Sequence, residues 1–155
     1  MEVFVKLKKY LRDNQVEFKE IHHQPTRTSQ EAADARGEET RIGGKALVMK
    51  LGKEFRLLVI SASRKMDSRI IKDYFNVKRT RFAYPEELLK LTGLVPGSVP
   101  PFGRPILDLD LYLDESITKN NRIAFNAGSL TDSIIMDIED YLRLAQPQII
   151  KFSRE

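Results

Sequence analysis

The sequence predicts an α+β fold in which helices surround a mixed β-sheet. Three observations support this class: helical and strand-like apolar patterns alternate along the chain, two neighbouring apolar runs have hairpin spacing, and no segment has the composition of a linker. The chain has 155 residues, and we expect residues 1–155 to form one domain. Hydrophobic residues make up 41% and charged residues 31%, which is typical of a folded globular protein.

The first third of the chain predicts two helices and a strand between them. Apolar residues on one helical face predict a helix over residues 4–13, and residues 16–22 follow as a short strand. Thr28 and Glu31 have the spacing of a capping box. A short helix should therefore begin after Thr28 and end at Gly37, because glycine commonly closes a helix.

The middle of the chain predicts a hairpin and two helices. Apolar runs at residues 46–51 and 55–60 are separated by Gly-Lys-Glu, which is the pattern of a β-hairpin. Asp67 can cap the helix that follows it. Pro85 suits the first position of the next helix, and Gly93 should end that helix.

The last third predicts a stiff loop, three strands and a helix. Residues 94–105 contain four prolines and two glycines, so they should form a loop. We expect strands over residues 106–113, 123–125 and 130–136. Asp137 can cap the last helix, which should end before the proline that follows it.

The composition excludes several kinds of chemistry. The chain has no cysteine, which removes disulfides, thiol nucleophiles and thiolate metal sites and fits a reducing compartment. The net charge of +4 permits a polyanionic partner without requiring one. The longest apolar run, residues 57–60, is far shorter than the roughly 18 residues of a membrane span, and the N-terminus lacks signal-peptide features. We therefore expect a soluble cytoplasmic protein with no membrane partner.

Familiar cofactor and catalytic motifs are also missing. The residues around Gly44 and Lys45 do not complete a Walker loop, and Ser98 does not lie in a Gly-x-Ser-x-Gly elbow. The only histidines, His22 and His23, are neighbours, so they should point to opposite faces of a strand and make a poor metal pair. A histidine at a strand end is the simplest interpretation of each, and a general base is the alternative. We expect no metal and no cofactor.

Three segments remain as candidates for a site. Lys45 follows two glycines at the start of a strand, where a lysine can hold a phosphate or carbonyl oxygen, although a solvated surface charge is more common. The loop over residues 92–103 is stiff, and its free N–H groups can surround an oxyanion; a rigid connector is the alternative. The polar turn over residues 126–132 can line the same pocket or simply close a hairpin.

These three segments, in this order and followed by the last helix, resemble the YbaK and prolyl-tRNA synthetase-associated editing family, the trans-acting aminoacyl-tRNA deacylases. The resemblance extends over residues 3–145, and its most specific part is Val-Pro-Pro-Phe-Gly at residues 99–103, together with the position of Lys45. It implies an α+β domain whose mixed sheet curls into a partly open barrel. It also implies hydrolysis of the ester that joins a wrong, small amino acid such as alanine, cysteine or serine to tRNA.

The resemblance also implies a set of site residues. Lys45 matches the family's active-site lysine. The implied substrate-binding residues lie in the loop and in the turn: Gly93, Pro96, Gly97, Pro100, Pro101, Phe102, Gly103, Asn126, Gly128 and Ser129. The resemblance assigns no role to Asp132.

The implied chemistry needs no strong nucleophile, because an aminoacyl ester is already activated. Lys45 can hold an oxygen of the substrate, loop N–H groups can stabilise the developing charge, and a water or the free ribose hydroxyl can supply the reacting oxygen. Expected partners are aminoacyl-tRNA and an aminoacyl-tRNA synthetase. Six basic residues are candidates either for phosphate contacts or for plain surface charge: Arg64, Lys65, Lys78, Arg79, Arg81 and Arg104.

Two other functions stay open at this point. One is a non-catalytic module that binds tRNA or a synthetase, and the other is a pocket for a small nucleotide or amino-acid adduct unrelated to tRNA. Turnover of a mischarged tRNA distinguishes the deacylase from both.

Overall fold

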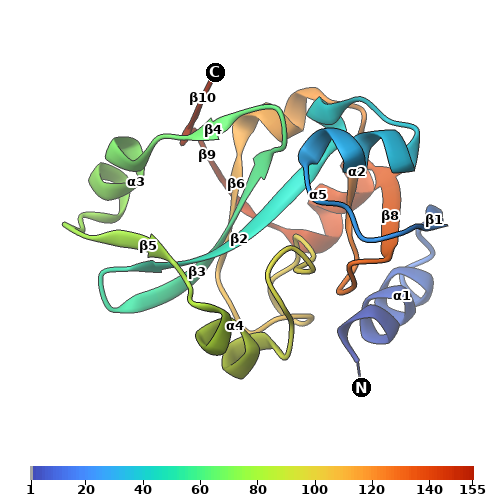
Figure 1. Ribbon diagram of the computed structural model, residues 1–155, viewed down its shortest axis with the longest axis horizontal. Coiled ribbons are helices and arrows are strands. Elements are labelled where there is room, and N and C mark those ends of the chain that lie inside the picture. The colour runs from blue at the N-terminus through green and yellow to red at the C-terminus, as the bar shows by residue number, and fades with distance from the viewer. Residues whose placement is uncertain (1) are drawn as a thin grey trace.

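A computed structural model describes residues 2–155, and its strands form three sheets with helices around them (Figure 1). The helices are α1 (Val3–Asp13), α2 (Ser29–Arg36), α3 (Ser68–Phe75), α4 (Pro85–Thr92) and α5 (Ile138–Ala145), and the short 3-10 turns are η1 (Thr40–Ile42) and η2 (Glu115–Lys119). The strands are β1 (Phe18–His22), β2 (Gly44–Leu51), β3 (Glu54–Ser61), β4 (Lys65–Met66), β5 (Thr80–Phe82), β6 (Leu111–Asp114), β7 (Arg122–Asn126), β8 (Asp132–Asp137), β9 (Gln148–Ile150) and β10 (Ser153–Arg154). The predicted α+β class is confirmed.

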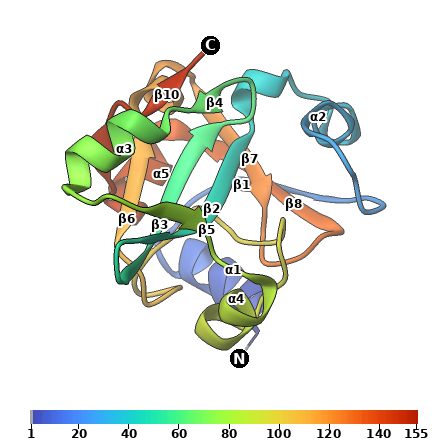
Figure 2. The ribbon, with the colours of Figure 1, turned by 60° about the vertical axis from the view of Figure 1, so that its left-hand side comes forward.

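The largest sheet has the strand order β5-β2-β3-β6-β9 and mixes strand directions. β2 and β3 form the predicted antiparallel hairpin, whereas β6 is parallel to both of its neighbours. β1, β8 and β7 form an antiparallel sheet, and β10 pairs with β4. A bridge between Gly43 and Ala124 brings the start of β2 beside β7, as Figure 2 shows. The largest sheet is mixed, as expected, and within residues 2–155 no sheet closes into a barrel.

The helix ends follow the signals in the sequence. Thr28 Oγ1 accepts a hydrogen bond from the Glu31 N–H at 3.0 Å, and Gly37 ends α2 with a left-handed φ of 70°. The carboxylates of Asp67 and Asp137 accept hydrogen bonds from the first-turn N–H groups of α3 and α5. These caps satisfy donors that would otherwise lack a partner, which typically stabilises a helix by about 1 kcal/mol.

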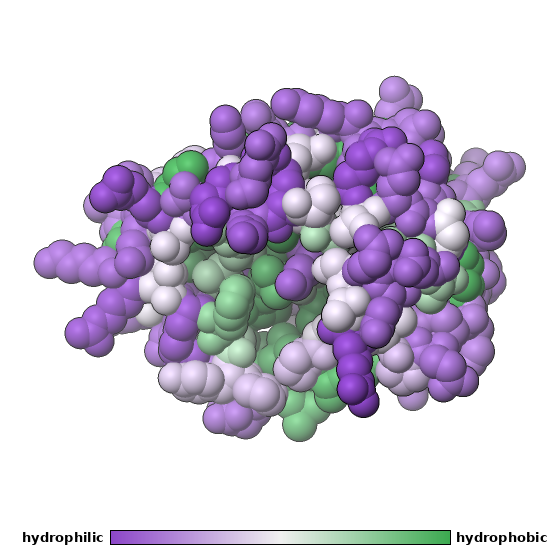
Figure 3. Space-filling view, turned by 45° about the horizontal axis from the view of Figure 1, so that its top comes forward, coloured by the Kyte–Doolittle hydropathy of each residue, from purple (hydrophilic) through white to green (hydrophobic). Residues whose placement is uncertain are grey.

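Two large clusters of buried side chains, and a small third one around Ile42, Ala124 and Ile135, hold the elements together. The larger cluster includes Phe102, Phe125 and Tyr141, whose rings meet edge to face at centroid distances of 5.2 and 5.7 Å. The second large cluster lies between the large sheet and α3. On the face drawn in Figure 3, hydrophobic side chains gather around a hollow, with hydrophilic side chains around it. None of the helices in residues 2–155 has the length and apolar character needed to cross a membrane.

The predicted strand over residues 106–113 is wrong in its first half. Only residues 111–114 form a strand, because the N–H groups of Ile106 and Leu107 both bond to the Gly103 carbonyl oxygen at 2.9 Å. Ile106, Leu107 and Leu109 are nevertheless buried. Their apolar pattern therefore reflects a turn that packs into the core and not a ladder of strand hydrogen bonds.

Candidate functional site

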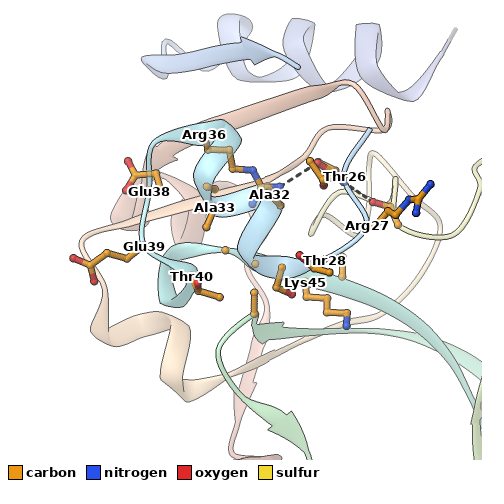
Figure 4. Close-up of a pocket in the computed structure, with 18 of the residues that line it drawn as sticks. Thr26, Arg27, Thr28, Ala32, Ala33, Arg36, Glu38, Glu39, Thr40 and Lys45 are labelled. Carbon is orange, nitrogen blue, oxygen red and sulfur yellow. Dashed lines mark hydrogen bonds between the residues drawn. The ribbon is translucent and has the colours of Figure 1, made fainter. Parts of the chain in front are cut away.

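A pocket of about 240 Å³ lies between α2, the start of β2, the loop after α4 and the end of β7 (Figure 4). Its lining includes Lys45, Gly97 and Asn126 from the three candidate segments, together with Arg36 and Val99. The structure thus brings at least one residue of each candidate segment to the same cavity. The volume lies below the roughly 300–1,000 Å³ of most sites for drug-sized ligands, which favours a small group as the occupant.

Lys45 is the second residue of β2, and the start of this strand borders the pocket. Lys45 is paired with Ile60 of β3, and its side chain is exposed. Its ammonium takes part in none of the ion pairs of residues 2–155. Gly44 is required by packing, since a Cβ there would lie 2.7 Å from Cδ1 of Ile123. The start of β2 therefore packs against β7, while the ammonium of Lys45 next to it has no acidic partner in the described chain.

The two acidic residues that line the pocket, Glu38 and Glu39, form ion pairs with arginines that do not line it. Glu38 binds the Arg122 guanidinium through contacts of 2.7 to 3.0 Å, and those hydrogen bonds lower the pKa of Glu38 despite its partial desolvation. Glu39 binds Arg41 at 2.6 Å. In Figure 4 both carboxylates extend to the opposite side from Lys45. The pocket therefore retains a positive charge that suits an anionic or carbonyl oxygen.

Arg36 is a pocket residue that the sequence analysis missed. Its side chain is buried, with 9% of the residue exposed. Nε donates to Ser133 Oγ at 2.9 Å and Nη2 donates to Asn126 Oδ1 at 3.1 Å. Burial lowers the pKa of Arg36 to about 10, so it stays charged at neutral pH. A basic residue in the last turn of a helix is common for electrostatic reasons, and no local pattern indicates that this one points inward.

Asn126 joins the turn to the loop. Its Oδ1 accepts from Arg36, and its Nδ2 donates to the Gly97 carbonyl oxygen at 2.7 Å. Gly97 has a φ of 87°, a conformation that side chains rarely adopt. The position of the loop at the pocket therefore depends on one amide side chain and one glycine.

The other two turn residues of the predicted site do not line this pocket. Gly128 packs against α1, where an added Cβ would lie 3.0 Å from Cγ1 of Val3. Ser129 Oγ donates to Asp132 Oδ2 at 2.7 Å, and His22 Nδ1 lies 3.0 Å from Asp132 Oδ1. Burial would raise the pKa of Asp132, but these hydrogen bonds outweigh it and the pKa is lowered. Asp132 thus organises the turn.

The second half of the loop lies inside the core. Pro100, Pro101, Phe102 and Gly103 are all buried. The Tyr141 hydroxyl donates to the Pro101 carbonyl oxygen at 2.6 Å, and the Phe102 ring packs against the Tyr141 ring. A Cβ on Gly103 would lie 2.5 Å from a backbone carbonyl oxygen. These four residues anchor the loop, whereas its exposed start, with Gly93 and Pro96, lies outside the pocket lining.

The two histidines have separate partners. His23 Nδ1 lies 2.8 Å from the Gln24 carbonyl oxygen, which can only accept, so this nitrogen carries the hydrogen. In the neutral ring, Nε2 then accepts from Ser133 Oγ at 2.7 Å. His22 bonds to Asp132 instead. Residues 2–155 contain no cluster of side chains that could hold a metal ion.

The six basic residues proposed for phosphate contacts differ in their surroundings. Arg81 binds Glu87 in a bidentate pair, and Arg104 binds two aspartates, so their charges are already balanced. Arg64 donates to Ser153. Lys65, Lys78 and Arg79 are exposed and form no ion pair within the described part of the chain.

Comparisons with known proteins cover the whole of this site. A family model described as the aminoacyl-tRNA editing domain matches residues 23–144, which include every pocket residue named above. The multifunctional Ser/Thr-tRNA deacylase ProXp-y of Escherichia coli (strain K12) is 34% identical over 145 residues, which are 89% of this chain and 85% of that protein.

A synthetase segment and a solved structure are also similar. A proline–tRNA ligase of Macrococcus caseolyticus (strain JCSC5402) is 23% identical over 121 residues, which are 78% of this chain and 21% of the ligase. The crystal structure of a proposed trans-editing enzyme for prolyl tRNA synthetase has a TM-score of 0.84 and 25% identity, and the match covers 100% of this chain and 99% of that one.

Proposed function

The chain belongs to the aminoacyl-tRNA editing domain family, and from this premise we propose that it hydrolyses the ester of mischarged tRNA carrying a small amino acid. Alanine, cysteine and serine are the candidates, and the name of the relative ProXp-y adds threonine. The observation that carries the proposal is the small pocket in which Lys45 keeps an unpaired charge.

Lys45 is the residue that we propose for the reaction. Its exposed ammonium can bind a phosphate oxygen or the ester carbonyl oxygen as the aminoacyl end enters the pocket. A water oxygen attacks the ester carbon, the bond to the ribose oxygen breaks, and that oxygen takes up a proton. The products are the free amino acid and tRNA with both terminal hydroxyls restored.

Gly97 and Asn126 form the proposed wall against the substrate, since they line the pocket and bond to each other. We propose that the buried segment 100–103 acts indirectly, because its anchoring in the core fixes the position of Gly97. Gly128 and Ser129 act in the same indirect way, by fixing the turn that follows Asn126.

We also propose that residues 1–155 act as one editing domain, in the cytoplasm. Aminoacyl-tRNA is the proposed substrate, and we propose that its hydrolysis needs no metal or cofactor. An aminoacyl-tRNA synthetase is the second proposed partner, because it would release the mischarged tRNA. Similarity to a segment of a proline–tRNA ligase supports that partner.

A panel of radiolabelled aminoacyl-tRNAs tests this function. We expect release of alanine, cysteine, serine or threonine, and slow release of phenylalanine and tyrosine. Salt-sensitive binding of tRNA without turnover would instead support a non-catalytic module. Binding of a small nucleotide adduct with no effect on any aminoacyl-tRNA would support the third function.

A further inference from the structure

Arg36 is a charged residue of the pocket, and the reaction proposed above does not use it. We propose that its guanidinium binds the carbonyl oxygen of the aminoacyl ester and stabilises the negative charge that develops on it. This inference rests on the proposed function and adds a catalytic residue from α2 to a site otherwise built from β2, the loop and β7.

The first argument is that the charge of Arg36 is buried without an acidic partner. Burying a charge is unfavourable unless an opposite charge or several hydrogen bonds compensate for it. Arg81, Arg104 and Arg122 each bind a carboxylate. Arg36 is buried more deeply than these, yet its partners within residues 2–155 are a neutral hydroxyl and a neutral amide oxygen. A ligand oxygen with negative charge would complete the compensation.

The second argument is the orientation of the guanidinium. Nε and Nη2 are held by Ser133 and Asn126, which fixes the plane of the group. Nη1 lies 3.5 Å from the position that a Cβ on Gly43 would occupy, and both residues line the pocket. Nη1 has no hydrogen-bond partner in the described chain. Figure 4 shows the Arg36 side chain among the residues that line the pocket.

The third argument is that the supports of Arg36 are themselves held in place. Asn126 also bonds to Gly97, and Ser133 also contacts His23 Nε2 at 2.7 Å. A donor fixed in this way needs no reorganisation when charge develops on the substrate. Such preorganised donors account for a large part of the rate in acyl-transfer enzymes.

Burial distinguishes the task of Arg36 from that of Lys45. Lys45 is exposed, so it can meet a phosphate that remains at the pocket mouth, whereas the buried Arg36 can be reached only by the group that enters. That group carries the ester carbonyl and an amino group that is positive when protonated. Arg36 repels the ammonium and attracts the carbonyl oxygen, so it also orients the ester.

The test compares Arg36→Gln with wild type on two substrates, seryl-tRNA and a phosphate-free seryl ester of adenosine. We expect Arg36→Gln to lower kcat by about 10²- to 10³-fold on both substrates, with a smaller change in KM. Arg56→Gln is the matched control, because Arg56 is half-buried, stacks on Phe75 and lies outside the pocket. A loss of activity on seryl-tRNA that disappears with the phosphate-free ester would show that Arg36 holds a phosphate and would overturn the proposal.

Two further measurements separate catalysis from folding. Methylguanidinium should restore part of the activity of Arg36→Ala without changing its Tm, which a purely structural arginine would not allow. An adenosine carrying a 3′-seryl amide cannot be hydrolysed through an ester, and its binding should weaken at least tenfold in Arg36→Gln. If wild type hydrolyses seryl-tRNA and Arg36→Gln does so equally well, the Arg36 proposal alone is wrong. If wild type neither hydrolyses any aminoacyl-tRNA nor binds the amide, both proposals are wrong.

Discussion

Replacing Tyr141 by phenylalanine tests how the core holds the loop beside the pocket. Tyr141 is fully buried, and its hydroxyl donates to the Pro101 carbonyl oxygen at 2.6 Å. Phenylalanine keeps the ring that packs on Phe102 but leaves this buried carbonyl oxygen without its donor. Such a loss typically lowers the free energy of unfolding by about 1 to 3 kcal/mol.

Thermal unfolding gives the readout. For a chain of this length each 1 kcal/mol shifts Tm by about 2–4 °C, so a loss of about 1 to 3 kcal/mol should lower the Tm of Tyr141→Phe by roughly 2 to 12 °C. Tyr10→Phe is the matched control, because the Tyr10 hydroxyl donates to the Leu144 carbonyl oxygen at 3.2 Å in a half-buried position. Its Tm should fall less, since water can replace that bond.

The same variant has a pH signature. Burial raises the pKa of Tyr141 above its ordinary value, so the associated stability is present below about pH 10 and is lost as the pH rises further. Wild type should therefore lose its advantage over Tyr141→Phe in strongly alkaline solution. A Tyr141→Phe protein with an unchanged Tm at neutral pH would refute the assignment of this hydrogen bond as an anchor of the loop.

Four other predictions concern stability and binding. Gly103→Ala should lower the free energy of unfolding by at least about 1 to 3 kcal/mol in urea titrations, because the new Cβ meets the Leu109 carbonyl oxygen at 2.5 Å. Asp114 is buried; burial opposes its ionisation, but hydrogen bonds from Ser116, Phe152 and Ser153 lower its pKa overall. The ionised carboxylate of Asp114 therefore stabilises the folded protein above about pH 4, and this stabilisation is lost as the pH falls. The unfolding free energies of wild type and Asp114→Asn should then converge in acid. Log K for tRNA should fall with log salt at a slope near −2, as expected for about three phosphate contacts, and tight binding that ignores salt would contradict this. Alanyl-, seryl- or cysteinyl-tRNA should be cleaved faster than phenylalanyl-tRNA, because a small rigid pocket excludes a large side chain by shape.

The sequence predicts the long elements of the fold well because their signals are local. Helix caps at Thr28, Asp67 and Asp137 and the hairpin of β2 and β3 depend on residues within a few positions of one another. The sequence analysis missed the strands β4, β5, β9 and β10 because each has two or three residues, which is too few to show a period. Their pairing depends on the fold around them.

The sequence predicts that the three candidate segments share a pocket, but it does not predict every residue that lines this pocket. The candidate segments meet at one pocket through Lys45, Gly97 and Asn126, as their family resemblance implies. The role of Arg36 depends on Ser133 and Asn126, which are about 90 residues away or more, so no local pattern could reveal it. The buried position of Phe102 likewise depends on contacts with β7 and α5.

Lys45→Ala provides the most direct test of the proposed function. Lys45 is exposed and has no ion-pair partner in the described chain, so its loss should change the free energy of unfolding by less than about 0.5 kcal/mol. Deacylation of mischarged tRNA should fall by about 30- to 1,000-fold, and Lys45→Arg should restore little of it because a planar guanidinium fits differently from a compact ammonium. A folded Lys45→Ala protein that deacylates at the wild-type rate would contradict the assignment of Lys45 to the reaction.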